Sequence, residues 1–157
     1  MSKAVWGPAT WSMLHCLVLK IDDSQNLELL NNLHLEPLKQ LINSICVNLP
    51  CPYCADHARE LIKKSNFFQI NDILTLRNFI FQMHNKVNER LKKPIMDYST
   101  HLEKYKNVKL VDVINTFIKV YNNNSGITMM LYNFYKKQVI TQLRQYFNTY
   151  AKLYTLN

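Results

Sequence analysis

The chain has only two glycines in 157 residues, and this scarcity restricts its possible folds more than any other feature. Tight hairpin turns and phosphate-binding loops depend on glycine, so hairpin-rich β architectures and Gly-rich nucleotide loops are disfavoured. Apolar residues instead recur at intervals of three and four, as on one face of a helix. We therefore predict an all-α chain.

Proline, capping residues and apolar periodicity indicate where the helices lie. We expect helices over 8–20, 24–49, 51–66, 72–92, 99–105, 108–121 and 127–154. Pro37 should break the second of these or begin its second piece, Asn71 or Asp72 should cap the fourth, and Ser99 the fifth. Residues 122–126 are the clearest loop. The last helix carries an apolar and aromatic stripe of Val139, Leu143, Tyr146, Tyr150 and Tyr154.

Composition indicates one globular domain, with 48% hydrophobic and 19% charged residues. The formal charge is 19 − 11 = +8. No acidic residue follows Asp112, whereas five basic residues do: Lys119, Lys136, Lys137, Arg144 and Lys152. A solvated basic helix face explains this excess, and a nucleic-acid site is the alternative. No signal-peptide core and no run of 18 apolar residues occurs, so we expect a cytoplasmic protein without a membrane span.

The sequence Cys51-Pro52-Tyr53-Cys54 enters a helix directly after Pro50. Unpaired N–H groups and the helix dipole at a helix start stabilise thiolates, the form that attacks disulfides. The same spacing also provides half of a zinc site, which could be completed by His57 and either Cys46 or His15. The motif alone therefore leaves a redox dithiol and a zinc site open.

Two further clusters carry side chains suited to a planar ligand. On the helix 72–92, His84, Asn85 and Asn88 lie on or beside one face, where buried polar groups need hydrogen-bond partners. Near the N-terminus, Trp6 and Trp11 precede a histidine at position 15. Each cluster, taken singly, is also compatible with ordinary core packing.

Together the three clusters resemble the Erv/ALR family of FAD-linked sulfhydryl oxidases, especially the short enzymes of large cytoplasmic DNA viruses. The matching motifs are Trp-Gly-x-x-x-Trp-x-x-x-His at 6–15, Leu-Pro-Cys-Pro-x-Cys-x-x-His-Ala at 49–58, and His-Asn-x-Val-Asn-x-x-Leu-x-Lys-Pro at 84–94. The resemblance covers residues 6 to about 106.

The resemblance implies a four-helix bundle with a short fifth helix that binds FAD, at 1–107, followed by a helical C-terminal extension at 108–157. The extension should pack on the core or at a dimer contact. On matching positions the cofactor-binding residues are Gly7, Thr10, Trp11, His15, His84, Asn85, Val87, Asn88, Lys93 and Tyr105. The first four would line the pocket, the next four would hold the adenosine, Lys93 would meet the diphosphate, and Tyr105 would pack on the cofactor.

The implied activity is thiol oxidation through Cys51 and Cys54. A substrate thiolate attacks the more exposed Cys51, and Cys54, with a lowered pKa, passes two electrons through FAD to O₂, which forms hydrogen peroxide. His57 could assist with protons or be a solvated histidine. Protein thiols are the expected substrates and a homodimer the expected assembly.

Departures from the family pattern concern cysteines. Lys63 and Tyr98 stand where many relatives have a second disulfide, and no cysteine follows Cys54 to act as a shuttle. Substrates therefore meet Cys51 directly or through a separate small dithiol protein. Cys16 and Cys46 are interpreted as buried, small hydrophobic side chains. The alternative to an oxidase is a zinc-binding or scaffold module whose basic tail binds nucleic acid.

Overall fold

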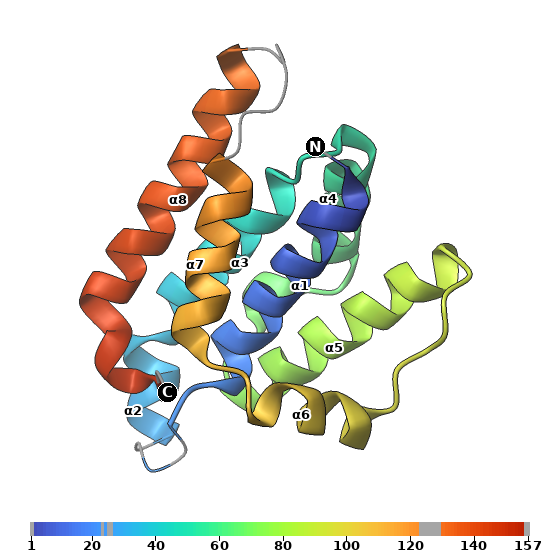
Figure 1. Ribbon diagram of the computed structural model, residues 1–157. Helices are drawn as coiled ribbons and strands as arrows, with labels where there is room; N and C mark the ends of the chain where they lie inside the picture. Colours follow the sequence, from blue (N-terminus) through green and yellow to red (C-terminus); the bar gives the residue numbers. More distant parts are fainter. Residues whose placement is uncertain (1, 23, 25–26, 123–129, 156–157) are drawn as a thin grey trace.

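The computed structural model describes residues 2–22, 24, 27–122 and 130–155, and these parts are helical (Figure 1). The all-α prediction is confirmed. In chain order the elements are α1 (Lys3–Leu19), α2 (Leu27–Leu33), α3 (Leu35–Val47), α4 (Pro52–Lys64), the 3₁₀ turn η1 (Phe67–Gln69), α5 (Ile73–Arg90), α6 (Tyr98–Lys106), α7 (Leu110–Asn122), α8 (Met130–Tyr150) and the 3₁₀ turn η2 (Ala151–Leu153).

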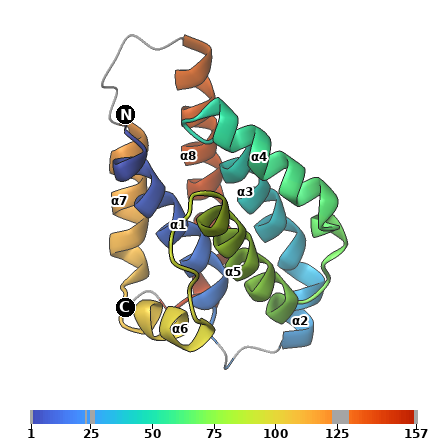
Figure 2. The same cartoon turned by 90° about the vertical axis from the view of Figure 1, so that its right-hand side faces the viewer.

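Helix α1 lies at the centre of the bundle. Figure 1 shows α7 and α8 on one side of it and α4, α5 and α6 on the other, and Figure 2 shows α1 between α7 and α4. The most extensive contacts of α1 are with α7 and α5, while α3 packs on α4 and α8. Since α1 separates the two sides, its residues contribute both to the core and to whatever lies between α4, α5 and α6.

Helix α1 begins five residues earlier than the proline at position 8 predicted. The N–H groups of Val5 and Trp6 both donate to Ser2 O, which closes a first turn ahead of the proline. Pro8 and Ala4 are exposed, so the carbonyl that Pro8 cannot bond remains open to water. The buried Trp6 then fixes this first turn against the bundle.

Other helix boundaries follow local capping chemistry. The break between α2 and α3 falls at His34, and Pro37 lies in the first turn of α3, where its missing N–H costs no helical bond. Asp72 caps α5, and it is one of the two caps predicted from the sequence. The cap of α6 is Asp97, not the predicted Ser99, because the carboxylate of Asp97 accepts the N–H of Thr100.

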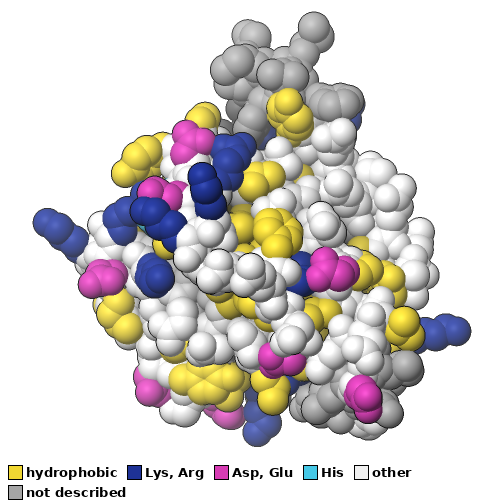
Figure 3. All heavy atoms as spheres, turned by 180° about the vertical axis from the view of Figure 1, so that it is seen from behind, with side chains coloured by type: hydrophobic (Ala, Val, Ile, Leu, Met, Phe, Trp, Pro, Cys, Tyr) yellow, Lys and Arg dark blue, Asp and Glu magenta, His cyan; other side chains and the backbone are white. Residues whose placement is uncertain are grey.

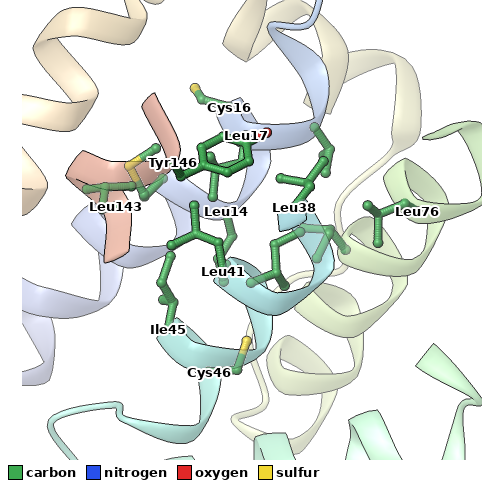
Figure 4. Packing of buried hydrophobic residues seen from close by; sticks show 14 of the residues in the cluster. Leu14, Cys16, Leu17, Leu38, Leu41, Ile45, Cys46, Leu76, Leu143 and Tyr146 are labelled. Atoms are coloured by element: carbon green, nitrogen blue, oxygen red, sulfur yellow. The ribbon is translucent and has the colours of Figure 1, made fainter. Parts of the chain in front are cut away.

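One hydrophobic core joins α1, α3, α5, α7 and α8. Figure 4 shows Leu14 and Leu17 of α1 meeting Leu41 of α3 and Leu143 of α8. Cys16 and Cys46 belong to this core and lie well apart in it. Burial raises the pKa of Cys16 to about 11 and that of Cys46 to about 12, so both thiols stay protonated at neutral pH.

The C-terminal helices are held to α1 by hydrogen bonds as well as by apolar packing. Val139 and Leu143 are fully buried, and one isolated β-bridge pairs Ile21 with Tyr154. The Tyr154 hydroxyl donates to Leu17 O at 2.8 Å. The predicted aromatic stripe of α8 therefore faces the bundle, and residues 110–122 and 130–155 share the core of the rest.

Charge is distributed unevenly over the surface. Figure 3 shows Lys, Arg, Asp and Glu side chains gathered at one edge of the back face. On α4, Arg59 pairs with Asp56 and Lys64 with Glu60. In the tail, Lys136 is buried, so the predicted basic residues do not form one solvated face. The predicted loop at 122–126 and the predicted helix start at 127 fall mainly outside the described residues.

No helix among the described residues combines the length and the apolar character needed to cross a bilayer.

Candidate active site

A cavity of about 420 Å³ lies between the first half of α1 and the helices α4, α5 and α6. This volume is within the range of small-molecule and cofactor sites. Its walls are mainly apolar and aromatic, and Cys46 and Leu49 close it from the end of α3. The cavity thus lies on the side of α1 opposite to α7.

Most of the site residues predicted from the family resemblance line this cavity. They are Gly7, Thr10, Trp11, Cys54, His84, Val87, Asn88, Lys93 and Tyr105. Three predicted residues are not part of the lining: Cys51, His15 and Asn85. Cys51 is the neighbour of Cys54 at the start of α4, and His15 contacts the lining from behind.

A ring stack forms one wall of the cavity. The rings of Trp11 and His84 are parallel within 6°, and their centroids lie 3.9 Å apart. His15 Nε2 and His84 Nδ1 share a hydrogen bond of 2.8 Å, while the ring centroid of His101 lies 4.2 Å from that of His15. Burial, with the nearby charges of His101, Lys104 and Lys93, lowers the pKa of His84 to about 4. The imidazoles of this wall are therefore neutral at pH 7.

Asn85 shapes the cavity indirectly. Its amide Nδ2 donates to Met96 O at 3.1 Å, and its Oδ1 accepts the Met96 N–H at 2.9 Å. These two bonds hold the chain that follows α5, which turns back at Lys92 with φ 56°. The turn brings Lys93 into the cavity wall. The role predicted for Asn85 in ligand binding stays a prediction, and the bonds to Met96 show that its amide also holds the backbone.

The two thiols of the motif have different surroundings. Cys51 is half-buried and caps α4, with its Sγ accepting the Cys54 N–H at 3.2 Å, whereas Cys54 is 8% exposed and lines the cavity. Tyr53 between them is 70% exposed. The outer position predicted for Cys51 therefore agrees with the structure.

The acidity of the pair differs from the expectation that Cys54 has the lowered pKa. Burial acts to raise the pKa of Cys51, but hydrogen bonds from Cys54 and from the Tyr53 N–H, with the charge of Lys3, bring it below the usual value. Burial raises the pKa of Cys54, and its hydrogen bond to Cys51 and the charge of Cys51 raise it further. With both thiols free, Cys51 is thus the more acidic of the two.

Among the described residues, the Lys and Arg side chains that line the cavity are Lys3, Arg90, Lys93 and Lys104. No Asp or Glu is among the described residues of the lining. The cavity therefore suits an anionic ligand. His57 also lines it, and burial together with the charge of Arg90 lowers its pKa, so it is neutral at pH 7.

Several site residues lie outside the sequence predictions. Lys3 and Arg90 reach the cavity from the first turn of α1 and the last residue of α5, and His101 is buried behind His15. Thr10 Oγ1 donates to Trp6 O, so Tyr121 of α7 donates to Thr10 Oγ1 at 2.9 Å and holds it from the other side of α1.

The zinc alternative is not favoured. In the parts of the chain that the structure describes, no three His, Cys, Asp or Glu side chains are arranged to hold a metal ion.

Comparison with known proteins gives one consistent result. The model of the Erv1/Alr family matches residues 8–106. A protein of Invertebrate iridescent virus 3 is 33% identical over 103 residues, which are 65% of this chain and 66% of that relative. An African swine fever virus (isolate Pig/Kenya/KEN-50/1950) protein named FAD-linked sulfhydryl oxidase is 31% identical over 71% of this chain and 85% of its own length.

A cellular protein matches over a smaller part of its own length. FAD-linked sulfhydryl oxidase ERV2 of Saccharomyces cerevisiae is 33% identical over 99 residues, which are 63% of this chain and 47% of that protein. No solved structure gives a significant match. The matched region includes the Cys51–Cys54 pair and the cavity lining from Pro8 onward. It does not include the earlier lining residues Lys3, Ala4, Trp6 and Gly7, nor α7 or α8.

Proposed function

Because the chain belongs to the Erv1/Alr family, we propose that it is an FAD-dependent sulfhydryl oxidase that uses Cys51 and Cys54 as its redox pair. The viral and yeast relatives named above carry this activity in their names. The observation that carries the assignment is Cys54, a buried thiol in the wall of a cavity whose other walls hold the residues of the two remaining motifs.

The cavity has the chemistry that FAD requires. The Trp11 and His84 rings offer a flat surface, and the cations Lys93 and Lys104 suit a diphosphate. His15 Nδ1 and His101 Nδ1 are buried without a hydrogen-bond partner among the described residues, as expected beside a polar ligand site. We therefore propose that Gly7, Thr10, Trp11, His84, Val87, Asn88, Lys93 and Tyr105 hold the cofactor, supported from behind by His15 and Asn85.

The residues of this chain divide the thiol chemistry between them. A substrate thiolate bonds to Cys51 Sγ as the Cys51–Cys54 bond breaks, and the electron pair stays on Cys54 Sγ. A second substrate thiolate then attacks the bound substrate sulfur, releases Cys51 as thiolate and completes the substrate disulfide. The neutral ring of His57 can accept a proton in the cavity. When bound, FAD supplies the acceptor that takes two electrons from the dithiol and reduces O₂ with two protons to hydrogen peroxide.

The direct test measures thiol-dependent oxygen uptake and peroxide release by the purified yellow protein. Cys51→Ser and Cys54→Ser should each abolish turnover while FAD stays bound, because the cavity walls remain. Cys16→Ala is the matched control, since this buried thiol lies outside the cavity lining and its loss should leave turnover intact. Turnover that survives in Cys54→Ser would exclude the proposed role.

The extent of the domains and the partners are also proposals. We propose that residues 1–107 form the oxidase domain and 108–157 its extension. We also propose that protein thiols are the substrates, and that a separate small dithiol protein can relay their electrons to Cys51. The exposed Tyr53 beside a half-buried Cys51 supports access by a protein. A cytoplasmic location is proposed from the resemblance.

A homodimer is proposed on the same basis. From Ala9 to Val18, α1 has no exposed side chain, so a contact through the first helices would use the first turn of α1, where Val5 is 52% exposed, or Leu33 of α2, which is 66% exposed. Sedimentation of the wild type and of Leu33→Asp tests this contact: a dimer that Leu33→Asp dissociates is expected, and a monomeric wild type would exclude it.

A further inference from the structure

Arg90 joins the end of α5 to the redox motif. It is the last residue of α5 and is half-buried, and it lines the same cavity as Cys54. Its guanidinium carbon lies 5.0 Å from the centroid of the Tyr53 ring, within the range of a cation–π contact. Tyr53 stands between the two cysteines, so the contact holds the guanidinium beside the dithiol.

The guanidinium has donors without acceptors. Its Nε and Nη1 atoms are buried and have no hydrogen-bond partner among the described residues. Buried charged donors are costly unless an acceptor or an opposite charge is near. No carboxylate is found in the described lining of the cavity, so an anion that forms in the cavity itself is the acceptor that would satisfy them.

We propose that Arg90 is a positioning residue that stabilises the thiolate leaving at Cys54 Sγ when a substrate thiolate bonds to Cys51 Sγ. This inference rests on the proposed function and deepens it. In the step, the Cys51–Cys54 bond breaks, a bond forms between the substrate sulfur and Cys51 Sγ, and the electron pair of the broken bond stays on Cys54 Sγ. A cation held at the leaving sulfur lowers the free energy of that product.

The charge on Cys51 decides when this cation matters. In the free dithiol, burial and the hydrogen bond and charge of Cys51 raise the pKa of Cys54, while Lys3 and Arg90 act to lower it. Once Cys51 is bonded to a substrate sulfur it carries no charge, and its contribution to the pKa of Cys54 disappears. Burial and the two cations then remain, so the pKa of the Cys54 thiol released in this step is lower than in the free dithiol, and Cys54 Sγ is a better leaving group when the Cys51–Cys54 bond breaks.

The other groups that face Cys54 are few. Lys3 approaches from α1, His57 follows one turn later on α4, and Lys93 and Lys104 line the same cavity. His57 is neutral at pH 7 and adds no charge. Arg90 differs from the other cations because it is fastened to the motif by its contact with Tyr53.

The test isolates Cys54 in a Cys51→Ser background. Serine keeps the helix cap and, like Cys51 in the mixed disulfide, carries no charge. The rate of Cys54 alkylation by iodoacetamide is measured from pH 5 to 10, with the modified residue identified by mass spectrometry, in protein freed of FAD and in protein with FAD. Arg90→Gln should slow alkylation at pH 7 about three- to tenfold and move the midpoint to higher pH.

Three further variants sharpen the result. Arg90→Lys should keep most of the wild-type alkylation rate, because lysine retains the positive charge although it lacks the planar guanidinium that contacts Tyr53. Lys86→Gln removes a charge one turn earlier on α5 from an exposed position outside the cavity, and should change nothing. If Arg90→Gln does not fold, Arg90→Met keeps the aliphatic stem and gives the same comparison.

An unchanged midpoint in folded Arg90→Gln or Arg90→Met would overturn the proposal. An effect that occurs only with FAD bound would also overturn it, because the guanidinium would then serve the cofactor. These outcomes are separate from failure of the proposed function, which would appear as a wild type without thiol-dependent oxygen uptake whatever Arg90 does.

Discussion

Two clusters of buried histidines and aromatic rings lie in different parts of the bundle. One joins His15, His84 and His101 to Trp11 beside the cavity, and the other joins His34 to tyrosines of α8 and the C-terminal segment. In both clusters burial lowers the histidine pKa, to about 4 for His84 and for His34. Residue type and burial alone therefore do not distinguish them.

Hydrogen bonding distinguishes the two clusters. His34 Nε2 bonds the Tyr146 hydroxyl, which shares a 2.6 Å hydrogen bond with the Tyr154 hydroxyl, which in turn donates to Leu17 O. None of the buried side-chain nitrogen and oxygen atoms of His34, Tyr146 and Tyr154 lacks a hydrogen-bond partner. Beside the cavity, in contrast, His15 Nδ1 and His101 Nδ1 are unsatisfied. The closed network holds α8 to the bundle, and the open one has room for a ligand.

The largest expected effect concerns the side of the bundle with the closed hydrogen-bond network, where α8 packs. Leu143 is fully buried in the core, and Leu143→Ala should lower the free energy of unfolding by about 2–5 kcal/mol, because a cavity replaces the lost contacts. Urea unfolding measures this change, with Gln142→Ala at the exposed neighbour as control. The FAD affinity of the folded fraction should not change. A parallel loss of FAD affinity would mean that the two sides are not separate.

A substitution on the side with the cavity should change FAD affinity more than stability. His84→Ala should weaken FAD binding by about 1–3 kcal/mol, since one buried hydrogen-bonding and stacking partner is removed. Its matched variant is Tyr146→Phe, which breaks the hydroxyl chain to His34 and should reduce stability while FAD affinity stays the same. Titration of the apoprotein with FAD, alongside thermal unfolding, measures both. Equal effects of the two variants on FAD affinity would remove the distinction.

The smallest expected effect is on pH dependence. The pKa values of His34 and His84 are lowered to about 4 in the folded chain, below the ordinary value of 6.5. As the pH falls below 6.5, the unfolded chain binds protons that the folded chain does not, so stability declines between pH 6.5 and about 4. After solvent screening each histidine contributes about 1 kcal/mol, or about 2–4 °C in Tm.

Thermal scans at pH 7.5 and 5 measure this decline. His34→Gln should remove part of it without affecting FAD content. A Tm that does not change between the two pH values would show that these histidines are not held neutral.

The sequence predicted those site residues that belong to recognisable motifs. Cys54, Trp11 and His84 were predicted because the three motifs that contain them resemble those of the Erv/ALR family, and all three line the cavity. Lys3 and Arg90 were missed, since they meet the dithiol only after three helix ends converge. Such long-range convergence leaves no periodic signal in the chain.

The same limit applies to helix ends and to the C-terminal helices. The start of α1 at Lys3 depends on the packing of Trp6, and Pro8 alone predicted a later start. The stripe on α8 predicted that this helix buries one face, but not that Tyr146 would meet His34, 112 positions away. Local patterns therefore predicted the elements better than the contacts between them.

The most direct measurement of the central claim is anaerobic addition of one equivalent of dithiothreitol to the purified protein. The wild type and Cys46→Ala, whose substituted thiol also lines the cavity, should both lose the yellow absorbance of oxidised flavin. Cys54→Ser should stay yellow under the same conditions, because the sulfur that donates the electrons is gone. A colourless purified protein, or bleaching of Cys54→Ser at the wild-type rate, would contradict the account.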